Sequence, residues 1–413
     1  MTEPHGSRLR GWLLGLVLML ALLPSNVVAT ALPLLRTEWG ASAAEMGGVI
    51  AAYQVGYVLA VVFLLPLTDR VPAPRVIVGC SISTLVAFVL FPLVARDPLS
   101  AAVLRALGGA GLAGVYLPGV RVVAAAASES RRGLAVSLYV SAFYLGSSVS
   151  LWATGVLLGT TDWRGASLVL GGLSGLGVPL ALLAARGART PQGKAAILRL
   201  SVLRHEPLLR NILAYTGHAF ELYVGRAWLA AFLASILAGS GLYPQASDAA
   251  AEGGKWAALM GGVGTAGVWI GGWLSDRWGR APAATVLATA SGLLSLAFGW
   301  LGGVIQGWGL VVAIGCVYGV LTAADSAIYS TAVTEVAPPE ELGSAQAAQA
   351  FIGFLATAIA PVAAGFVLDL GGGYGGAFGL AGLASLAGAA VLFPLARLAV
   401  RHTRQPAGTL APR

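Results

Sequence analysis

Three titratable residues interrupt one strongly apolar stretch, AYTGHAFELYVGRAWLAAFLAS, which covers residues 214–235. His218, Glu221 and Arg226 lie within nine residues of one another. An ionised group is costly in apolar surroundings, so such groups usually face a polar cavity or a partner. Histidine and carboxyl groups exchange protons near neutral pH when their surroundings allow it, and a guanidinium group binds a carboxylate through two hydrogen bonds. The stretch therefore predicts proton exchange, anion binding or an internal charge pair.

The spacing of these residues fits one helix. If that helix begins near residue 211, Glu221 lies roughly 15 Å along it at about 1.5 Å per residue, near the middle of a bilayer. We interpret Glu221 as a proton-coupling residue, with His218 and Arg226 lining a cavity. The alternative is a local His218–Glu221 pair that only packs this helix against a neighbour.

A second polar face lies in YGVLTAADSAIYS. Tyr318, Thr322, Asp325 and Tyr329 recur at spacings of four, three and four residues, which places them on one side of a helix. Asp325 is a candidate proton carrier or the partner of an arginine, and Tyr329 a candidate cavity residue. A hydrogen-bonded seam between helices is the structural alternative.

Two arginines lie inside another apolar segment. Arg121, in VYLPGVRVV, is a candidate anchor for an anionic substrate, and its alternative is extension to the membrane surface. Arg105 lies nearer the opposite end of the same segment. Further cavity candidates, for which ordinary packing is the competing interpretation, are Asn26, Tyr116 and Tyr144.

The elements that must position these residues are membrane-spanning helices. The 413 residues are 57% hydrophobic and 10% charged, whereas soluble domains carry roughly 25% charged residues. Continuous apolar runs of about 20 residues favour spanning helices over an alternating β-barrel pattern. We predict an all-α membrane protein with twelve spans, at residues 11–35, 46–67, 76–95, 99–126, 133–158, 166–185, 211–238, 255–273, 283–301, 308–336, 344–368 and 377–398.

The net charge of +8 follows from basic loops, so it does not predict nucleic-acid binding. One set of loops holds 18 Lys and Arg residues and the opposite set holds four. The positive-inside rule then predicts an integral plasma (inner) membrane protein with both termini in the cytoplasm. Cys80 and Cys316 both fall within spans, and neither a metal site nor a cofactor is expected.

The chain divides into two similar halves. Asp69 and Asp276 each follow the second span of a six-span group, and Asp162 and Asp369 each follow the fifth. Both pairs are 207 residues apart, which indicates an internal duplication. We predict an N-terminal six-helix half at 1–185, a cytoplasmic linker at 186–210 and a C-terminal six-helix half at 211–413.

Two loops carry a specific family resemblance. GGWLSDRWGR, residues 271–280, resembles the Gly-x-Leu-Ala-Asp-Arg-x-Gly-Arg-Lys signature of the major facilitator superfamily (MFS), with Ala281 in place of the last basic residue. In the first-half copy Leu65 and Pro72 replace both glycines. RALGGAGLAG, residues 105–114, is similar to the family's Arg-x-x-x-Gly motif. The loops predict a conformational latch formed by Asp69, Arg70, Asp276, Arg277, Gly279 and Arg280. A solvated basic turn is the competing interpretation, most of all for the Asp69 loop.

The resemblance implies a function as well as a fold. It implies a transporter, not an enzyme, in which two pseudo-symmetric six-helix halves alternately expose a central site. It also implies that spans one, four, seven and ten surround that site, and that Arg105 acts in proton coupling or helix contact. The expected partners are a small-molecule substrate, protons and the lipid bilayer, and the expected functional unit is a monomer.

Three functions remain open at this point. The favoured one is proton-coupled symport of an organic anion, because several arginines lie inside spans. The second is drug/proton antiport, although YLGSSVSLWATG in span five lacks the proline of the usual exporter motif. The third, a membrane sensor, would need a soluble output domain, and the linker of about 25 residues is too short to fold alone.

Overall fold

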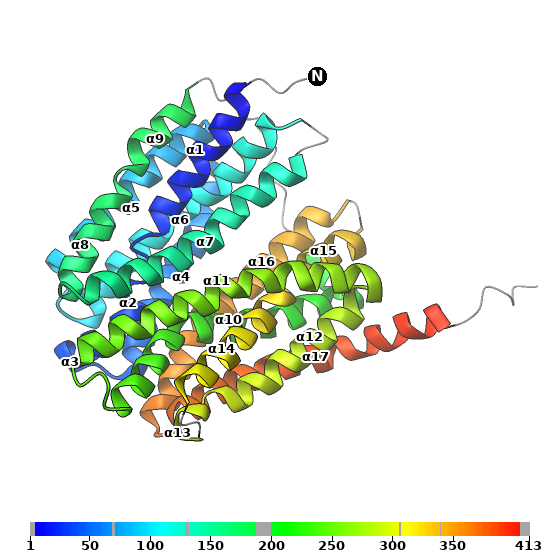
Figure 1. The fold of residues 1–413 in the computed structure, drawn as a ribbon. Coiled ribbons are helices and arrows are strands. Elements are labelled where there is room, and N and C mark those ends of the chain that lie inside the picture. Colours follow the sequence, from blue (N-terminus) through cyan, green and yellow to red (C-terminus); the bar gives the residue numbers. More distant parts are fainter. Residues whose placement is uncertain are drawn as a thin grey trace, which may run out of the picture. The chain divides into compact units, whose positions relative to one another are not determined.

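The computed structural model describes residues 5–67, 71–128, 132–186, 200–304, 307–338 and 340–404. These ranges consist of helices and short connections, with no strand among them (Figure 1). The first six spans are formed by α1 (His5–Leu22), α2 (Val27–Thr30), α3 (Leu32–Trp39), α4 (Ala43–Leu67), α5 (Ala73–Val94), α6 (Pro98–Ala126), α7 (Arg132–Leu158), α8 (Trp163–Ser174) and α9 (Gly177–Ala185).

The remaining elements follow a short 3-10 helix, η2 (Leu200–Arg204). They are α10 (Glu206–Gly239), α11 (Ala246–Trp278), α12 (Arg280–Phe298), α13 (Leu301–Val304), α14 (Trp308–Ala324), α15 (Ser326–Val336), α16 (Leu342–Asp369) and α17 (Gly373–Arg404). Eleven helical segments of the described chain are long and apolar enough to cross a membrane, and Leu9–Leu22 is a shorter apolar helix. The predicted all-α membrane fold is confirmed.

The first span differs from the single helix expected at 11–35. Its backbone leaves the helical path at residues 23–26 and resumes in the short α2 and then α3. Pro24 lacks an N–H group, which favours a break. The carbonyl groups at the break are satisfied by side chains from other spans: Ser150 donates to Leu23 O at 2.6 Å, and Arg105 donates to Ser25 O at 2.5 Å.

The tenth span is also broken, at Asp325, which separates α14 from α15. Asp325 has φ −87° and ψ −8°, and α15 restarts with Ile328 N donating to Asp325 O at 3.0 Å. The polar face expected on one continuous helix is therefore divided between two helices, with Asp325 at their junction.

The backbone packing divides the chain into two compact units. Unit 1 comprises Met1–Ala195, Arg226–Gly262 and Pro361–Leu370, and unit 2 comprises Ala196–Gly225, Val263–Ala360 and Gly371–Arg413. Three long helices, α10, α11 and α16, thus contribute one part to each unit. These units describe packing and not sequence duplication, so the predicted halves and linker stay a prediction.

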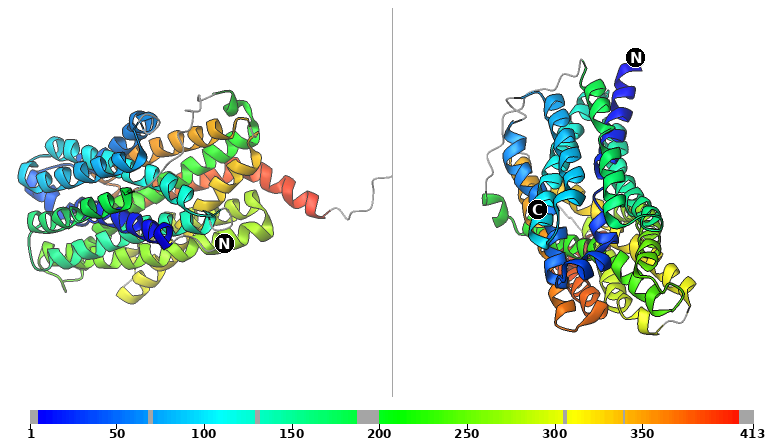
Figure 2. Two further views of the ribbon diagram at one scale, coloured as in Figure 1. Left: turned by 90° about the horizontal axis from the view of Figure 1, so that it is seen from above. Right: turned by 90° about the vertical axis from the view of Figure 1, so that its left-hand side faces the viewer.

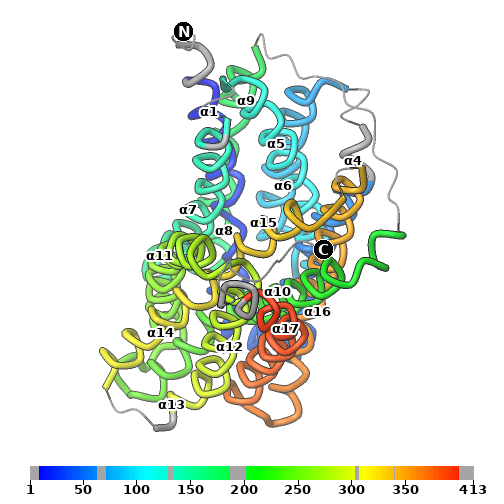
Figure 3. The backbone as a smooth tube through the Cα atoms, turned by 90° about the vertical axis from the view of Figure 1, so that its right-hand side faces the viewer, coloured from blue at the N-terminus to red at the C-terminus, as the bar shows by residue number. Residues whose placement is uncertain are grey.

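Each unit is a helix bundle in its own right. Within unit 1, α6 packs along both α4 and α5, and α1 packs against α7 and α9 (Figure 2). Within unit 2, α12 packs along α17 and also contacts α14 (Figure 3).

Asp97 begins α6 as its N-cap, and the Ser100 amide that donates to its carboxylate lowers the pKa of Asp97.

Glycines allow the helices of unit 1 to approach closely. A methyl group on Gly109 would overlap the carbonyl oxygen of Tyr53, and one on Gly56 would overlap the carbonyl oxygen of Ala106. The α4–α6 crossing therefore brings two backbones into direct contact, as small residues permit in membrane helices. This contact explains why the RALGGAGLAG segment is rich in glycine.

We expect Gly109→Val to destabilise the protein by at least about 2 kcal/mol, because the new side chain must push the backbones of α4 and α6 apart. Gly79→Val on α5 is the matched control, since nothing lies within 4 Å of a methyl group built there. Thermal unfolding of the two purified variants in the same detergent measures the difference. Equal unfolding temperatures would contradict the close crossing.

Candidate functional site

A histidine and an aspartate form the central contact of unit 2. His218 lies on α10 and Asp325 at the α14–α15 junction, and His218 Nδ1 is 2.7 Å from Asp325 Oδ1. Their side chains are only 3% and 2% exposed. The two atoms are close enough to form an ion pair when His218 is protonated, and a proton on either group removes the repulsion between a ring lone pair and the carboxylate. The pair can therefore hold a proton out of contact with water.

The remaining polar atoms of this pair also have partners. Tyr329 OH donates to Asp325 Oδ2 at 2.9 Å, and Ser326 Oγ lies 3.0 Å from His218 Nε2. Asn211, two turns earlier on α10, donates its side-chain amide to Tyr329 O at 3.0 Å. Helix α10 thus contacts α15 through Asn211 and through His218, and the Asp325 junction lies beside the His218 contact.

His218 and Glu221 each have a polar partner on another helix, and the alternative of a His218–Glu221 pair stays open. Glu221 accepts a hydrogen bond from Ser291 Oγ of α12 at 2.7 Å and lies beside Ser385 of α17. Residues three positions apart on a helix can meet, but each side chain here finds a buried polar partner on a neighbouring helix instead. Glu221 is 1% exposed, so its carboxyl group is buried in this structure, and its predicted role in proton coupling stays a prediction.

A cationic and aromatic cluster lies in unit 1. The guanidinium carbon of Arg226 is 5.9 Å from the ring centroid of Phe143 and 5.7 Å from that of Tyr144. Tyr116 of α6 packs on Phe143 with centroids 5.4 Å apart, and it stacks on Tyr139 at 6.1 Å. We call Arg226, Tyr116, Phe143 and Tyr144 the arginine–aromatic cluster. Three of its members were expected from sequence, and the structure brings them together through Phe143.

The other cavity candidates have structural contacts. Arg105 is buried, donates to Ser25 O and lies 4.7 Å from the ring centroid of Tyr53. Asn26 donates from its side chain to Ser147 O at 3.0 Å, which joins the break in the first span to α7. Arg121 is exposed near the end of α6. The contacts of Arg105 and Asn26 are those of a helix seam, and their functional roles stay predictions.

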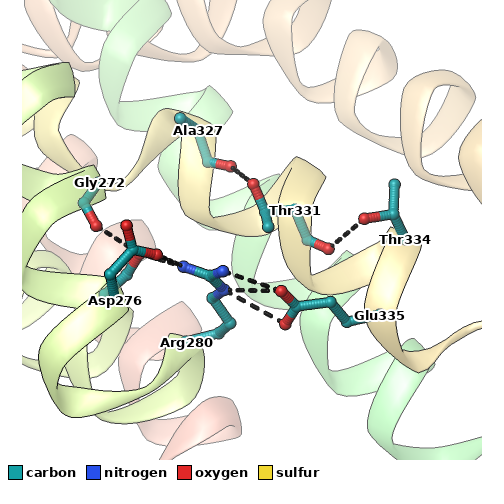
Figure 4. A network of polar contacts seen from close by, with 8 residues as sticks. Gly272, Asp276, Arg280, Ala327, Thr331, Thr334 and Glu335 are labelled. Atoms are coloured by element: carbon teal, nitrogen blue, oxygen red, sulfur yellow. Dashed lines mark hydrogen bonds and ion pairs between the residues drawn. The ribbon is translucent and has the colours of Figure 1, made fainter. Parts of the chain in front are cut away.

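The second signature loop is an ion-pair network inside unit 2 (Figure 4). Arg280 pairs with Asp276 at 2.6 Å and with Glu335 of α15 at 2.8 Å. Gly279 has φ +86°, a conformation that glycine adopts without strain, and this lets the chain turn between α11 and α12.

The predicted latch is only partly visible. Arg277 lies on the Trp273 ring, 4.1 Å from its centroid. Asp69 and Arg70 lie outside the described residues, so the first-half loop has no structural counterpart to compare. The latch role of all six residues stays a prediction.

Several partners in these sites were missed from sequence. Ser291, Ser326 and Phe143 are residue types that apolar helices often contain, and no spacing rule distinguishes them. Glu335 ends the tenth span in TEVAPPEE, where the carboxylates resemble an ordinary loop. Its position at the same predicted membrane face as Arg280 is the one signal that could have suggested the pair.

Known proteins are similar to this chain in sequence and in fold. A gallate transporter of Pseudomonas putida is 31% identical over 152 residues, which are 37% of this chain and 32% of that protein. The chain thus matches about a third of the length of that relative. A solved bacterial homologue of the human lysosomal transporter Spinster, in an inward-facing and occupied conformation, is 16% identical over 100% of both chains, with a TM-score of 0.74.

The nucleoside transporter NupG is 11% identical, with a TM-score of 0.71 over 98% of this chain and 100% of that one. These likenesses confirm the predicted twelve-helix fold. The family model described as Major Facilitator Superfamily matches residues 14–324 and 272–411. This integral membrane protein therefore belongs to the Major Facilitator Superfamily of transporters.

Proposed function

We propose that the protein moves an organic anion across the plasma (inner) membrane together with protons, by alternating access, with both termini in the cytoplasm. The observation that carries the proposal is the buried contact of 2.7 Å between His218 Nδ1 and Asp325 Oδ1. A transporter that exchanges protons needs a group that holds a proton away from water and releases it when water enters. The His218–Asp325 pair has the composition and the burial for this role.

The protonation states of the pair differ in net charge. When Nε2 of His218 is also protonated, one further proton on either Nδ1 or Oδ1 makes the pair neutral overall. Loss of that proton leaves one negative charge on the pair, to which the hydroxyl group of Tyr329 donates a hydrogen bond. An unpaired charge is costly at a buried site, so release of the proton favours a state in which water reaches Asp325. The junction between α14 and α15 is the segment that would move.

Glu221 is the competing proton carrier. Its carboxyl group is also buried, and its hydrogen-bond donors are the neutral hydroxyl groups of Ser291 and Ser385. We assign the proton to the His218–Asp325 pair because a second titratable group shares it there. The same transport assay separates the two assignments.

In proteoliposomes, an inwardly directed proton gradient should drive accumulation of the anion, and a protonophore should abolish it. Asp325→Asn should lower gradient-driven accumulation at least about tenfold while anion exchange across the membrane persists, because only proton release is removed. Asp248→Asn, in the first turn of α11, is the matched control and should behave as the natural protein.

Two outcomes would contradict this proposal. Accumulation that survives the protonophore would reject proton coupling. Normal accumulation by Asp325→Asn, with loss in Glu221→Gln, would reject the His218–Asp325 pair as the carrier.

The arginine–aromatic cluster supports an aromatic carboxylate as the anion. The guanidinium group of Arg226 lies against two rings, and a guanidinium group can bind a carboxylate in a bidentate manner. Phe143 and the two tyrosines offer ring faces and hydroxyl groups to a planar substrate. A relative described as a gallate transporter, whose substrate is a hydroxylated aromatic carboxylate, points in the same direction.

We expect Arg226→Lys to weaken inhibition of uptake by gallate and benzoate at least about tenfold, because lysine cannot form the bidentate contact. Phe143→Leu should weaken inhibition of uptake by benzoate more than inhibition by hexanoate, an aliphatic acid of equal charge, because only the ring contact is lost. Arg164→Gln is the matched control, since Arg164 also lies on an aromatic ring, Trp163, but in an exposed ion pair with Glu38. Equal effects on benzoate and hexanoate in Phe143→Leu would reject the aromatic preference.

A further inference from the structure

The first turn of α4 has an unusual set of hydrogen-bond partners. Helix N-termini leave their first N–H groups without helical acceptors. Ser42 and Glu45 satisfy two of these groups reciprocally: Ser42 N donates to Glu45 Oε2 at 2.8 Å, and Glu45 N donates to Ser42 Oγ at 3.1 Å. The two groups between them, Ala43 N and Ala44 N, donate to the two carboxylate oxygens of Asp369, each at 2.8 Å. One aspartate thus completes the cap of a helix more than 300 residues away in sequence.

Asp369 is badly placed with respect to its own helix. It is the last residue of α16, where the negative end of the helix dipole disfavours a carboxylate. Its compensation comes from the positive N-terminal end of α4 and from Arg36, whose Nη2 is 3.3 Å from Asp369 Oδ1. The position of Asp369 is favourable only while α16 lies against α4.

The repeat-related residue behaves differently. Asp162, 207 positions earlier, accepts from Gly165 N at 2.7 Å and so caps the helix that immediately follows it, α8. After Asp369 the chain instead passes through Gly371, with φ +83°, and α17 begins only at Gly373, with φ +59°. The carboxylate of Asp369 therefore does not cap α17, and it binds the N-terminus of α4 instead.

The backbones below this cap are in close contact. A methyl group on Gly365 would overlap Ala43 O, and one on Gly47 would overlap Pro361 O. Trp228 of α10 donates its Nε1–H to the same Pro361 O at 3.0 Å. All of these residues belong to unit 1, so the end of α16 is packed as part of that unit.

We propose that Asp369 is an electrostatic latch that holds the predicted outer ends of α4 and α16 together, by capping α4 in trans. Alternating access in this family requires the first and second six-span groups to separate at one end and then at the other. The Asp369 cap joins span two to span eleven and must break when the outer end opens. This inference does not depend on the identity of the substrate or of the coupling ion.

Distances between spin labels test the latch. Leu99→Cys and Leu242→Cys place labels on two exposed positions at the predicted outer end, in a Cys316→Ala background that leaves only the buried Cys80. Without substrate or gradient, Asp369→Asn should raise the ratio of long to short distances about fivefold, because the amide loses the negative charge that interacts with the α4 dipole and with Arg36, at a cost of roughly 1 kcal/mol. Asp162→Asn removes the same charge from the equivalent position of the repeat and should leave the distances unchanged.

An unchanged distribution in Asp369→Asn would overturn the latch, and so would an equal change in Asp162→Asn. If Asp369→Asn does not purify as a folded protein, Arg36→Gln replaces it as the test variant, since Arg36 is 45% exposed and touches the carboxylate from its rim. It should shift the distribution in the same direction by a smaller factor, and no shift would again overturn the proposal. Because no transport is measured, failure of the symport proposal would leave this result unaffected.

Discussion

Every buried polar group in this protein needs a partner within the protein, because the apolar interior of a membrane supplies none. The constraint is clearest where a spanning helix is interrupted. The first span breaks at residues 23–26, and its freed carbonyl groups are bound by Ser150 and Arg105 from two other spans. The break in the tenth span is held from α10 by Asn211 and His218. A broken span is therefore stable only as part of its bundle, which concentrates polar side chains at the breaks.

The same constraint determines which charges meet. His218 and Glu221 are neighbours on one helix, yet each binds a group on another helix, Asp325 and Ser291 respectively. A pair formed along one helix would leave the polar groups of the other helices buried without partners, at a cost of about 1–3 kcal/mol each. A pair formed between two helices gives the polar groups of both helices a hydrogen-bond partner. Titratable groups thus come to lie where helices contact one another, and a change of protonation there alters the contact itself.

This division also explains what could be predicted from sequence. The spans were predictable because length and apolar composition alone determine whether a helix can cross a membrane. His218, Asp325 and Tyr329 were found because charged and aromatic residues at helical spacing are rare in such segments. The two breaks were not found, since they depend on Arg105, Ser150 and other side chains distant in sequence. Ser291 and Phe143 were missed because nothing in their type or spacing separates them from ordinary span residues.

Internal duplication adds a limit of a different kind. Asp162 and Asp369 share an offset of 207 residues and both lie where the fifth span of a six-span group ends. Their carboxylates nevertheless cap different helices, α8 and α4, because the glycines after Asp369 delay the start of α17. A small change in one turn has thus converted a local cap into a contact between distant spans. Equivalence in a repeat establishes a shared position in the fold, whereas the role of a residue depends on which N–H groups and charges its own copy brings within reach.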